Sequence, residues 1–138
     1  MSFAQKSQEN LEIAEYYISK SKNVSAIVGN AYYAVFQKAK DFLVANQFDY
    51  SLFLKSNNFK PDERPFSHGT IRQAVQYCVV TQKGGDLGTI KELAKMDKLY
   101  AERRRAHYEA DIVKNKDGET CVLYAKNIIT TIDSFVKP

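Results

Sequence analysis

Three consecutive arginines and a histidine stand close together in the stretch from Leu99 to Glu109, which contains neither glycine nor proline. The stretch is therefore expected to be helical. Arg103 and His107 are four residues apart, so a helix places their side chains next to each other on one surface. Arginine offers fixed paired donors to phosphate oxygens, and a histidine that titrates near neutrality can move a proton. This pair has the chemistry needed to act on a phosphodiester.

Arg103 and His107 also continue an apolar stripe of the expected helix. Stepping back from Arg103 at helical spacing gives Tyr100, Met96 and Leu93. A cation and an imidazole at such positions are costly unless an anion or a second subunit meets them. The structural alternative is a salt bridge, for which Glu12 or Glu15 could supply the carboxylate.

The other basic residues have ordinary structural interpretations. Arg104 and Arg105 can form a solvated basic face, with Arg105 in reach of Glu109 one turn later. His107 can be a structural histidine whose hydrogen bonds are satisfied inside the protein. No carboxylate cluster or metal-ligand spacing accompanies the pair, so any chemistry is expected to need neither a metal nor a cofactor.

Length and composition predict one globular domain spanning residues 1–138, with 44% hydrophobic and 26% charged residues. The net charge of +4 permits polyanion binding without demanding it. The first residues contain no apolar signal region, and no run reaches membrane-spanning length. A cytoplasmic protein with no membrane partner is expected. Cys78 and Cys121 lie among apolar neighbours, far apart in sequence, which predicts buried free thiols.

Apolar spacing predicts an all-α protein, a compact up-and-down bundle of four to five helices. The expected helices cover about residues 2–22, capped by Ser2; 24–46, with Ser25 as a cap; 68–82, capped by Ser67; 87–109, capped by Asp86; and 119–136. The second helix should be central. Its apolar row is Val28, Ala31, Val35, Ala39 and Phe42.

The remaining segments are less regular. For residues 47–67 the residue pattern predicts one short helix or a loop anchored by apolar side chains. For residues 114–118 it predicts a turn. His68, at a helix start, is interpreted as a capping or packing histidine.

Three segments together resemble one known family. Residues 30–40 read NAYYAVFQKAK, residues 67–71 read SHGTI, and residues 99–108 read LYAERRRAHY. In this order they are similar to the AYYAxF helix, the HxxI helix start and the arginine-containing segment of HEPN-domain proteins. That family comprises small helical proteins of prokaryotic toxin–antitoxin and defence systems.

The resemblance implies a homodimer that, in active members, cleaves RNA without a metal in a cleft between protomers. Carried over, Arg103 would hold the scissile phosphate and His107 would act as the general acid or base. Tyr108, Arg104 and Tyr33 would shape the site or bind the substrate.

A second hypothesis is a non-catalytic HEPN module. Such a module would partner a separately encoded nucleotidyltransferase antitoxin or bind a nucleotide. It is motivated by the modest charge and by an Arg103 to His107 spacing that is shorter than in the family's nuclease motif.

Overall fold

The computed structural model describes residues 2–20, 24–49, 52–53, 55, 68–108 and 115–135, with residues 24, 107–108 and 115–116 described by their helical backbone alone. Its long helices are α1 (Phe3–Lys20), α2 (Val24–Ala45), α4 (His68–Lys83), α5 (Leu87–Tyr108) and α6 (Asn115–Asp133). The described residues contain no strand. The predicted all-α helical bundle is confirmed.

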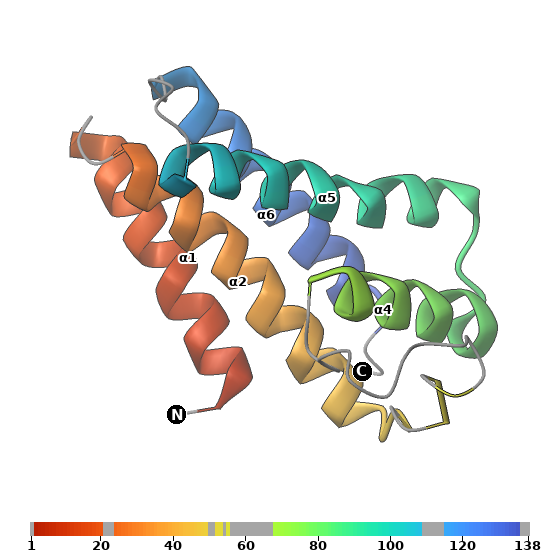
Figure 1. Ribbon diagram of the computed structural model, residues 1–138. Helices are drawn as coiled ribbons and strands as arrows, with labels where there is room; N and C mark the ends of the chain where they lie inside the picture. The colour runs from red at the N-terminus through yellow and green to blue at the C-terminus, as the bar shows by residue number, and fades with distance from the viewer. Residues whose placement is uncertain are drawn as a thin grey trace.

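Helix α2 occupies the centre of the bundle, as its apolar pattern predicts. It packs against all four other long helices. The α1 and α2 helices form an antiparallel pair, and the antiparallel α4 and α5 pair crosses it, with α5 lying over α2 and α6 (Figure 1). This crossing brings the arginine-rich end of α5 against the first half of α2.

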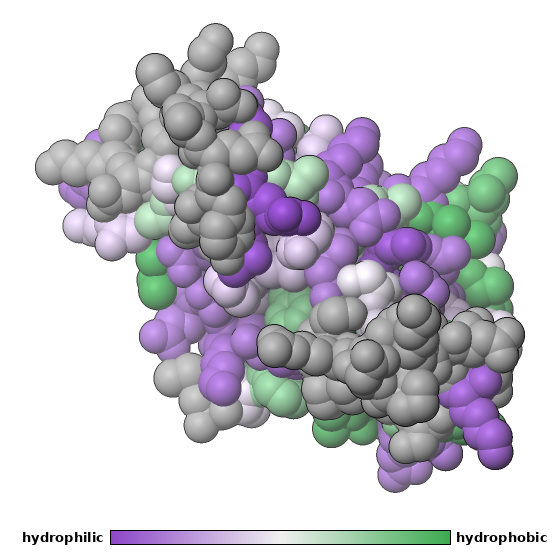
Figure 2. Space-filling model, viewed as in Figure 1, coloured by the Kyte–Doolittle hydropathy of each residue, from purple (hydrophilic) through white to green (hydrophobic). Residues whose placement is uncertain are grey.

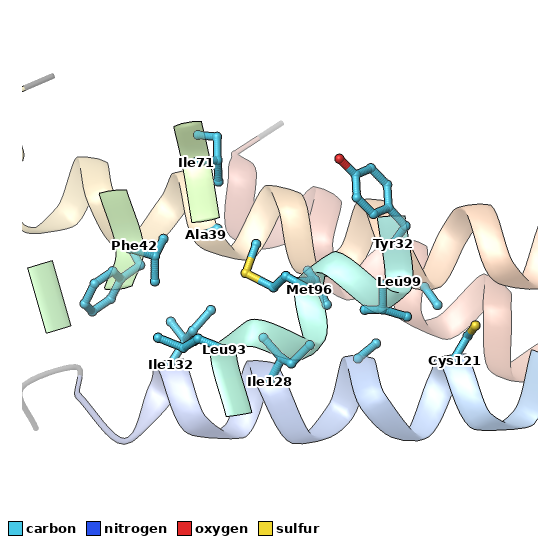
Figure 3. Close-up of a cluster of buried hydrophobic side chains, with 14 of the residues drawn as sticks. Tyr32, Ala39, Phe42, Ile71, Leu93, Met96, Leu99, Cys121, Ile128 and Ile132 are labelled. Atoms are coloured by element: carbon cyan, nitrogen blue, oxygen red, sulfur yellow. The ribbon is translucent and has the colours of Figure 1, made fainter. Parts of the chain in front are cut away.

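The core is built from the apolar faces of these helices. All five residues of the predicted α2 row are buried, and Phe42 is 1% exposed. Leu93, Met96 and Leu99 of α5 meet Ile128 and Ile132 of α6 beneath α2 (Figure 3). Cys78 and Cys121 are buried free thiols, as predicted. The packing fixes the rotation of α5, and therefore which of its residues face α2.

The helix ends follow local chemistry. Ser2 caps α1, because its hydroxyl accepts the Gln5 backbone N–H at 3.1 Å, and its own backbone N–H donates to Gln5 Oε1 at 2.8 Å. Ser25 lies inside α2 and is not its cap; Ser67 is outside the described residues. Between positions 47 and 67, Phe53 is helical and buried, and most other positions lie outside the described residues.

The break between the predicted helices 68–82 and 87–109 is confirmed, since α4 ends at Lys83 and α5 begins at Leu87. Gly84 adopts a φ of 74°, a left-handed conformation that glycine adopts without strain. Asp86 then caps α5, with its carboxylate accepting the Thr89 backbone N–H at 3.0 Å and the Thr89 hydroxyl at 3.1 Å. These bonds hold the pKa of Asp86 below its usual range.

Replacing Asp86 by alanine is expected to lower Tm by a few degrees at neutral pH, because two α5 donors lose their acceptor. Since the folded pKa is below the unfolded one, the stabilisation is present above the unfolded pKa and is lost as pH falls through the folded pKa. Thermal melts of wild type and Asp86→Ala should therefore converge in acid. Asp86→Asn, which keeps an acceptor, should stay close to wild type at neutral pH. A Tm difference between wild type and the alanine variant that stays constant from neutral pH into acid would contradict this role of the Asp86 carboxylate.

The start of α6 differs from the prediction. Residues 115–118 are helical rather than a turn, and α6 ends at Asp133 rather than near residue 136. Asp117 in the first turn accepts a bond from Arg105 of α5 at 3.1 Å, and Gly118 is buried. The predicted turn rests on the low helix propensity of glycine. Tertiary packing and this ion pair outweigh that propensity.

Candidate functional site

The end of α5 places Arg103 against two tyrosines of α2. Its Nη2 donates a hydrogen bond to the Tyr33 hydroxyl at 2.8 Å. The guanidinium carbon lies 5.0 Å from the centre of the Tyr33 ring and 5.2 Å from that of the Tyr32 ring, within the range of cation–π attraction. Two of the predicted site residues, Arg103 and Tyr33, are thus in direct contact although 70 positions separate them.

No carboxylate among the described residues lies within ion-pair distance of Arg103. The structural alternative, a salt bridge from Arg103 to Glu12 or Glu15, does not form: Glu15 pairs with Lys126 at 3.0 Å, and Glu12 accepts a bond from Gln8. The Nε of Arg103 is buried and has no hydrogen-bond partner in the described structure. Ring electrons and one phenolic oxygen therefore surround this cation, in place of an acidic group.

The neighbourhood of Arg103 is basic, aromatic and accessible. Tyr33 is 38% exposed. Arg104 is exposed, and its guanidinium carbon lies 5.9 Å from the centre of the Tyr100 ring. Hydrophilic side chains gather along α5 on the face shown in Figure 2. Exposed rings and arginines in one place are the groups that bind nucleobases and phosphates. We call Tyr33, Arg103 and Arg104 the arginine–tyrosine surface.

Arg105 has a different role from its neighbours. Its Nη2 donates to Glu102 at 2.7 Å and to Asp117 at 3.1 Å, and the hydrogen bond from Glu102, followed by that from Asp117, raises its pKa. The expected partner, Glu109, lies outside the described residues. Arg105 therefore joins α5 to the start of α6, and the prediction of a solvated basic face holds for Arg104 and not for Arg105.

His107 and Tyr108 belong to the last turn of α5. The helical backbone continues through both residues, so His107 follows Arg103 by one turn, as predicted. Their side chains lie outside the described part of the structure, and their predicted roles stay predictions.

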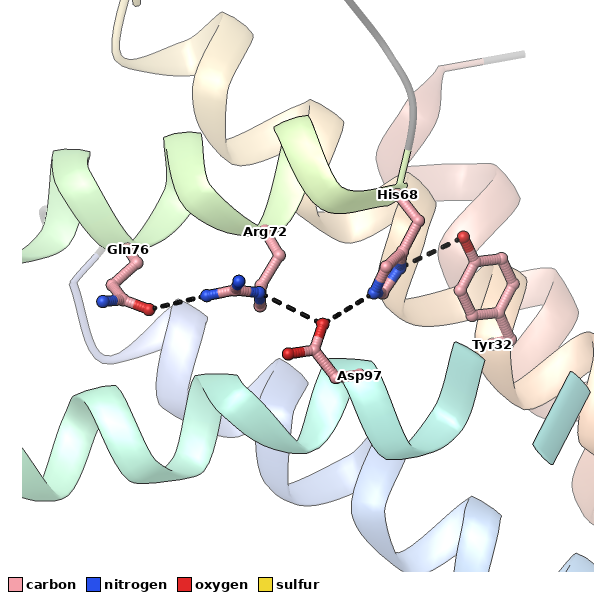
Figure 4. Close-up of polar contacts among 5 residues, drawn as sticks. All are labelled: Tyr32, His68, Arg72, Gln76 and Asp97. Atoms are coloured by element: carbon pink, nitrogen blue, oxygen red, sulfur yellow. Dashed lines mark hydrogen bonds and ion pairs between the residues drawn. The ribbon is translucent and has the colours of Figure 1, made fainter. Parts of the chain in front are cut away.

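A row of polar side chains lies beside the arginine–tyrosine surface, between α4, α5 and α2 (Figure 4). His68 Nε2 is 2.9 Å from Asp97 Oδ1, and its Nδ1 is 3.4 Å from the Tyr32 hydroxyl. Arg72 Nε is 3.1 Å from the same Asp97 oxygen, and Arg72 Nη1 donates to Gln76 at 3.1 Å. We call these five residues the polar row.

Burial determines the protonation states within the polar row. Burial lowers the pKa of His68, and this effect is larger than the opposing effect of Asp97. Burial likewise raises the pKa of Tyr32 well above its usual range, although Arg103 partly offsets it. The lowered pKa favours the neutral imidazole of His68, and the raised pKa keeps the Tyr32 hydroxyl protonated.

The sequence predicts a capping or packing role for His68 and does not connect this residue to a site. Its ring is indeed packed, stacked on Tyr100 with 4.2 Å between ring centres. A signal for the polar row was present, because His68, Arg72 and Gln76 recur every four residues on α4. This spacing places the three polar side chains on one face of α4, separate from the face formed by its apolar residues.

The described residues offer neither a cluster of metal ligands nor a membrane-spanning helix. No group of three or more histidine, cysteine or carboxylate side chains lies close enough together there to hold a metal ion. None of the described helices combines the length and the apolar character that crossing a membrane requires.

Comparison of the chain with protein-family models, with curated proteins and with solved structures gave no match in any of the three.

Proposed function

We propose that this chain is a HEPN-like endoribonuclease of toxin–antitoxin or antiphage type, which acts as a homodimer and without a metal. In the proposed reaction the 2′-hydroxyl of RNA attacks the adjacent phosphorus, and the bond to the 5′-oxygen breaks. Arg103 binds the phosphate oxygens and stabilises the negative charge that develops on them. His107 transfers a proton to or from one of the reacting oxygens. The products are a 2′,3′-cyclic phosphate and a free 5′-hydroxyl.

The observation that supports this proposal most is the environment of Arg103. A guanidinium that has an exposed tyrosine beside it and no described carboxylate partner retains donors for an anion. The exposed Tyr33 ring can stack on a base next to the bound phosphate. Arg104 adds a second cation one residue away, and the helical backbone puts His107 one turn beyond Arg103.

The test is RNA cleavage by the purified protein in EDTA. Wild type should cleave and leave cyclic phosphate ends, whereas Arg103→Ala and His107→Ala should each lose at least about a hundredfold in rate. Lys91→Ala removes the same charge from an exposed position of α5 and should retain wild-type activity.

Two outcomes of the same experiment would contradict the proposed mechanism. Cleavage that His107→Ala leaves unchanged would remove the proposed proton transfer. Cleavage that requires an added divalent cation would overturn the proposed mechanism.

The arginine–tyrosine surface also favours a second candidate, the non-catalytic module that binds a nucleotide or a nucleotidyltransferase partner. An exposed ring beside an arginine that has no carboxylate partner among the described residues can bind a nucleotide, whether or not a bond in it is then cleaved. Saturable nucleotide binding that Arg103→Ala abolishes, or copurification with a nucleotidyltransferase, together with no RNA turnover, would select this alternative.

A further inference from the structure

Tyr32 is the residue through which the polar row contacts Arg103. Its ring lies 5.2 Å from the Arg103 guanidinium carbon, and its hydroxyl lies 3.4 Å from His68 Nδ1. The side chain is 6% exposed, so protein groups alone determine where the ring lies. Whatever orients Tyr32 also orients the surface against which Arg103 packs.

His68 is held on two sides. Its ring is stacked on Tyr100 with an interplanar angle of 6°, and Asp97 Oδ1 is 2.9 Å from its Nε2. A neutral imidazole carries one N–H. Because the carboxylate of Asp97 can only accept, that N–H is on Nε2, and Nδ1 is left to accept the Tyr32 hydroxyl.

Asp97 also forms an ion pair with Arg72, although the Arg72 Nε–H makes no hydrogen bond in the described residues. The Asp97 side chain is 52% exposed, and a carboxylate so open to water would otherwise rotate freely. The Arg72 Nε at 3.1 Å shares the oxygen that His68 uses, and Gln76 holds the other end of Arg72. Figure 4 shows these links, which lead from Gln76 and Arg72 of α4 through Asp97 and His68 to Tyr32 of α2.

We propose that Asp97 and His68 are positioning residues, which fix Tyr32 and through it the orientation of the Arg103 guanidinium. The catalytic consequence rests on the proposed ribonuclease function, but the positioning is a property of the free protein. A purely structural role in joining α4 to α5 would instead affect stability without reaching Arg103.

The test uses protein with ¹⁵N-labelled arginine and follows the Nε–H signals of Arg103 and Arg105, identified by their loss in Arg103→Lys and Arg105→Lys. Tyr32→Phe keeps the ring and removes the hydroxyl. His68→Gln keeps an amide N–H near Asp97 but removes the acceptor at Nδ1. Both variants should shift the Arg103 signal and leave the Arg105 signal in place.

Two further variants separate positioning from packing. His68→Asn places an amide oxygen about as far from the backbone as Nδ1 but does not reach Asp97, so it should return the Arg103 signal part of the way toward the wild-type position. Tyr16→Phe removes a hydroxyl from an exposed tyrosine of α1 and should change nothing. An unmoved Arg103 signal in Tyr32→Phe and His68→Gln, with both variants folded, would overturn the proposal, as would a His68→Asn shift as large as that of His68→Gln.

Kinetics provide the second readout. Tyr32→Phe and His68→Gln should each lower kcat about tenfold with little change in KM, and the double variant should be no slower than either one, because both break the same link. Additive losses would overturn the proposal. Shifts of the Arg103 signal in a protein that cleaves no RNA would support the positioning and overturn the ribonuclease function.

Discussion

Arg103→Lys is expected to lower kcat for RNA cleavage about a hundredfold although the positive charge is kept. The arginine holds Tyr33 through one Nη, packs against two rings and still has further N–H donors for a phosphate. A lysine ammonium is a point charge, which cannot keep the Tyr33 bond and also present paired donors. Because the lost contacts act on charge that develops during the reaction, kcat and kcat/KM should fall together.

The matched control is Arg105→Lys. It makes the same chemical change two positions away, at a residue that pairs with Glu102 and Asp117, and an ammonium can retain an ion pair with either carboxylate. Its cleavage rate should stay within a fewfold of wild type. Equal rates for Arg103→Lys and wild type would show that charge alone suffices at this position, contrary to the proposed role of the guanidinium.

Phe42→Ala is expected to lower the free energy of unfolding by about 3–5 kcal/mol, the usual cost of emptying a buried phenylalanine site. Phe42 is the largest of the fully buried side chains in the described residues and comes from α2, which packs against every other long helix. A small domain has a total stability of about 5–15 kcal/mol, so the loss is a large share of the total. Urea unfolding should show a lower midpoint with an unchanged slope.

Val44→Ala is the control for this prediction. Val44 lies on the same helix and is 64% exposed, so its truncation should change the unfolding free energy by less than about 0.5 kcal/mol. If the two variants lost similar stability, α2 would not be the centre of the core.

The apolar periodicity of the sequence predicts the bundle well because helix packing obeys it directly. Val28, Val35 and Phe42 keep helical spacing on α2, and all three are buried. The α5 cap is equally local, because Asp86 needs only the N–H and hydroxyl of Thr89 three residues later. Such features depend on neighbours in sequence, which the chain itself displays.

Only the part of the candidate site that depends on neighbours in sequence can be predicted. The position of Arg103 follows from α5 alone, and Tyr33 is named only by the family resemblance. Their contact, in contrast, depends on how α5 crosses α2. The links from His68 to Asp97 and Tyr32 join three helices, and no spacing within one helix determines them. The helical start of α6 depends likewise on the bond between Arg105 and Asp117 across two helices.

Arg103 is expected to bind a phosphate of RNA, and an NMR titration measures this most directly. A short RNA that carries a 2′-deoxy sugar at the cleaved position, and is therefore inert, is added to protein with ¹⁵N-labelled arginine. The Arg103 guanidinium signals should move and saturate with RNA, the Arg105 signals should stay in place, and Arg103→Ala should weaken binding. Saturable binding in which the Arg103 signals stay in place, and which Arg103→Ala leaves intact, would contradict this role of Arg103.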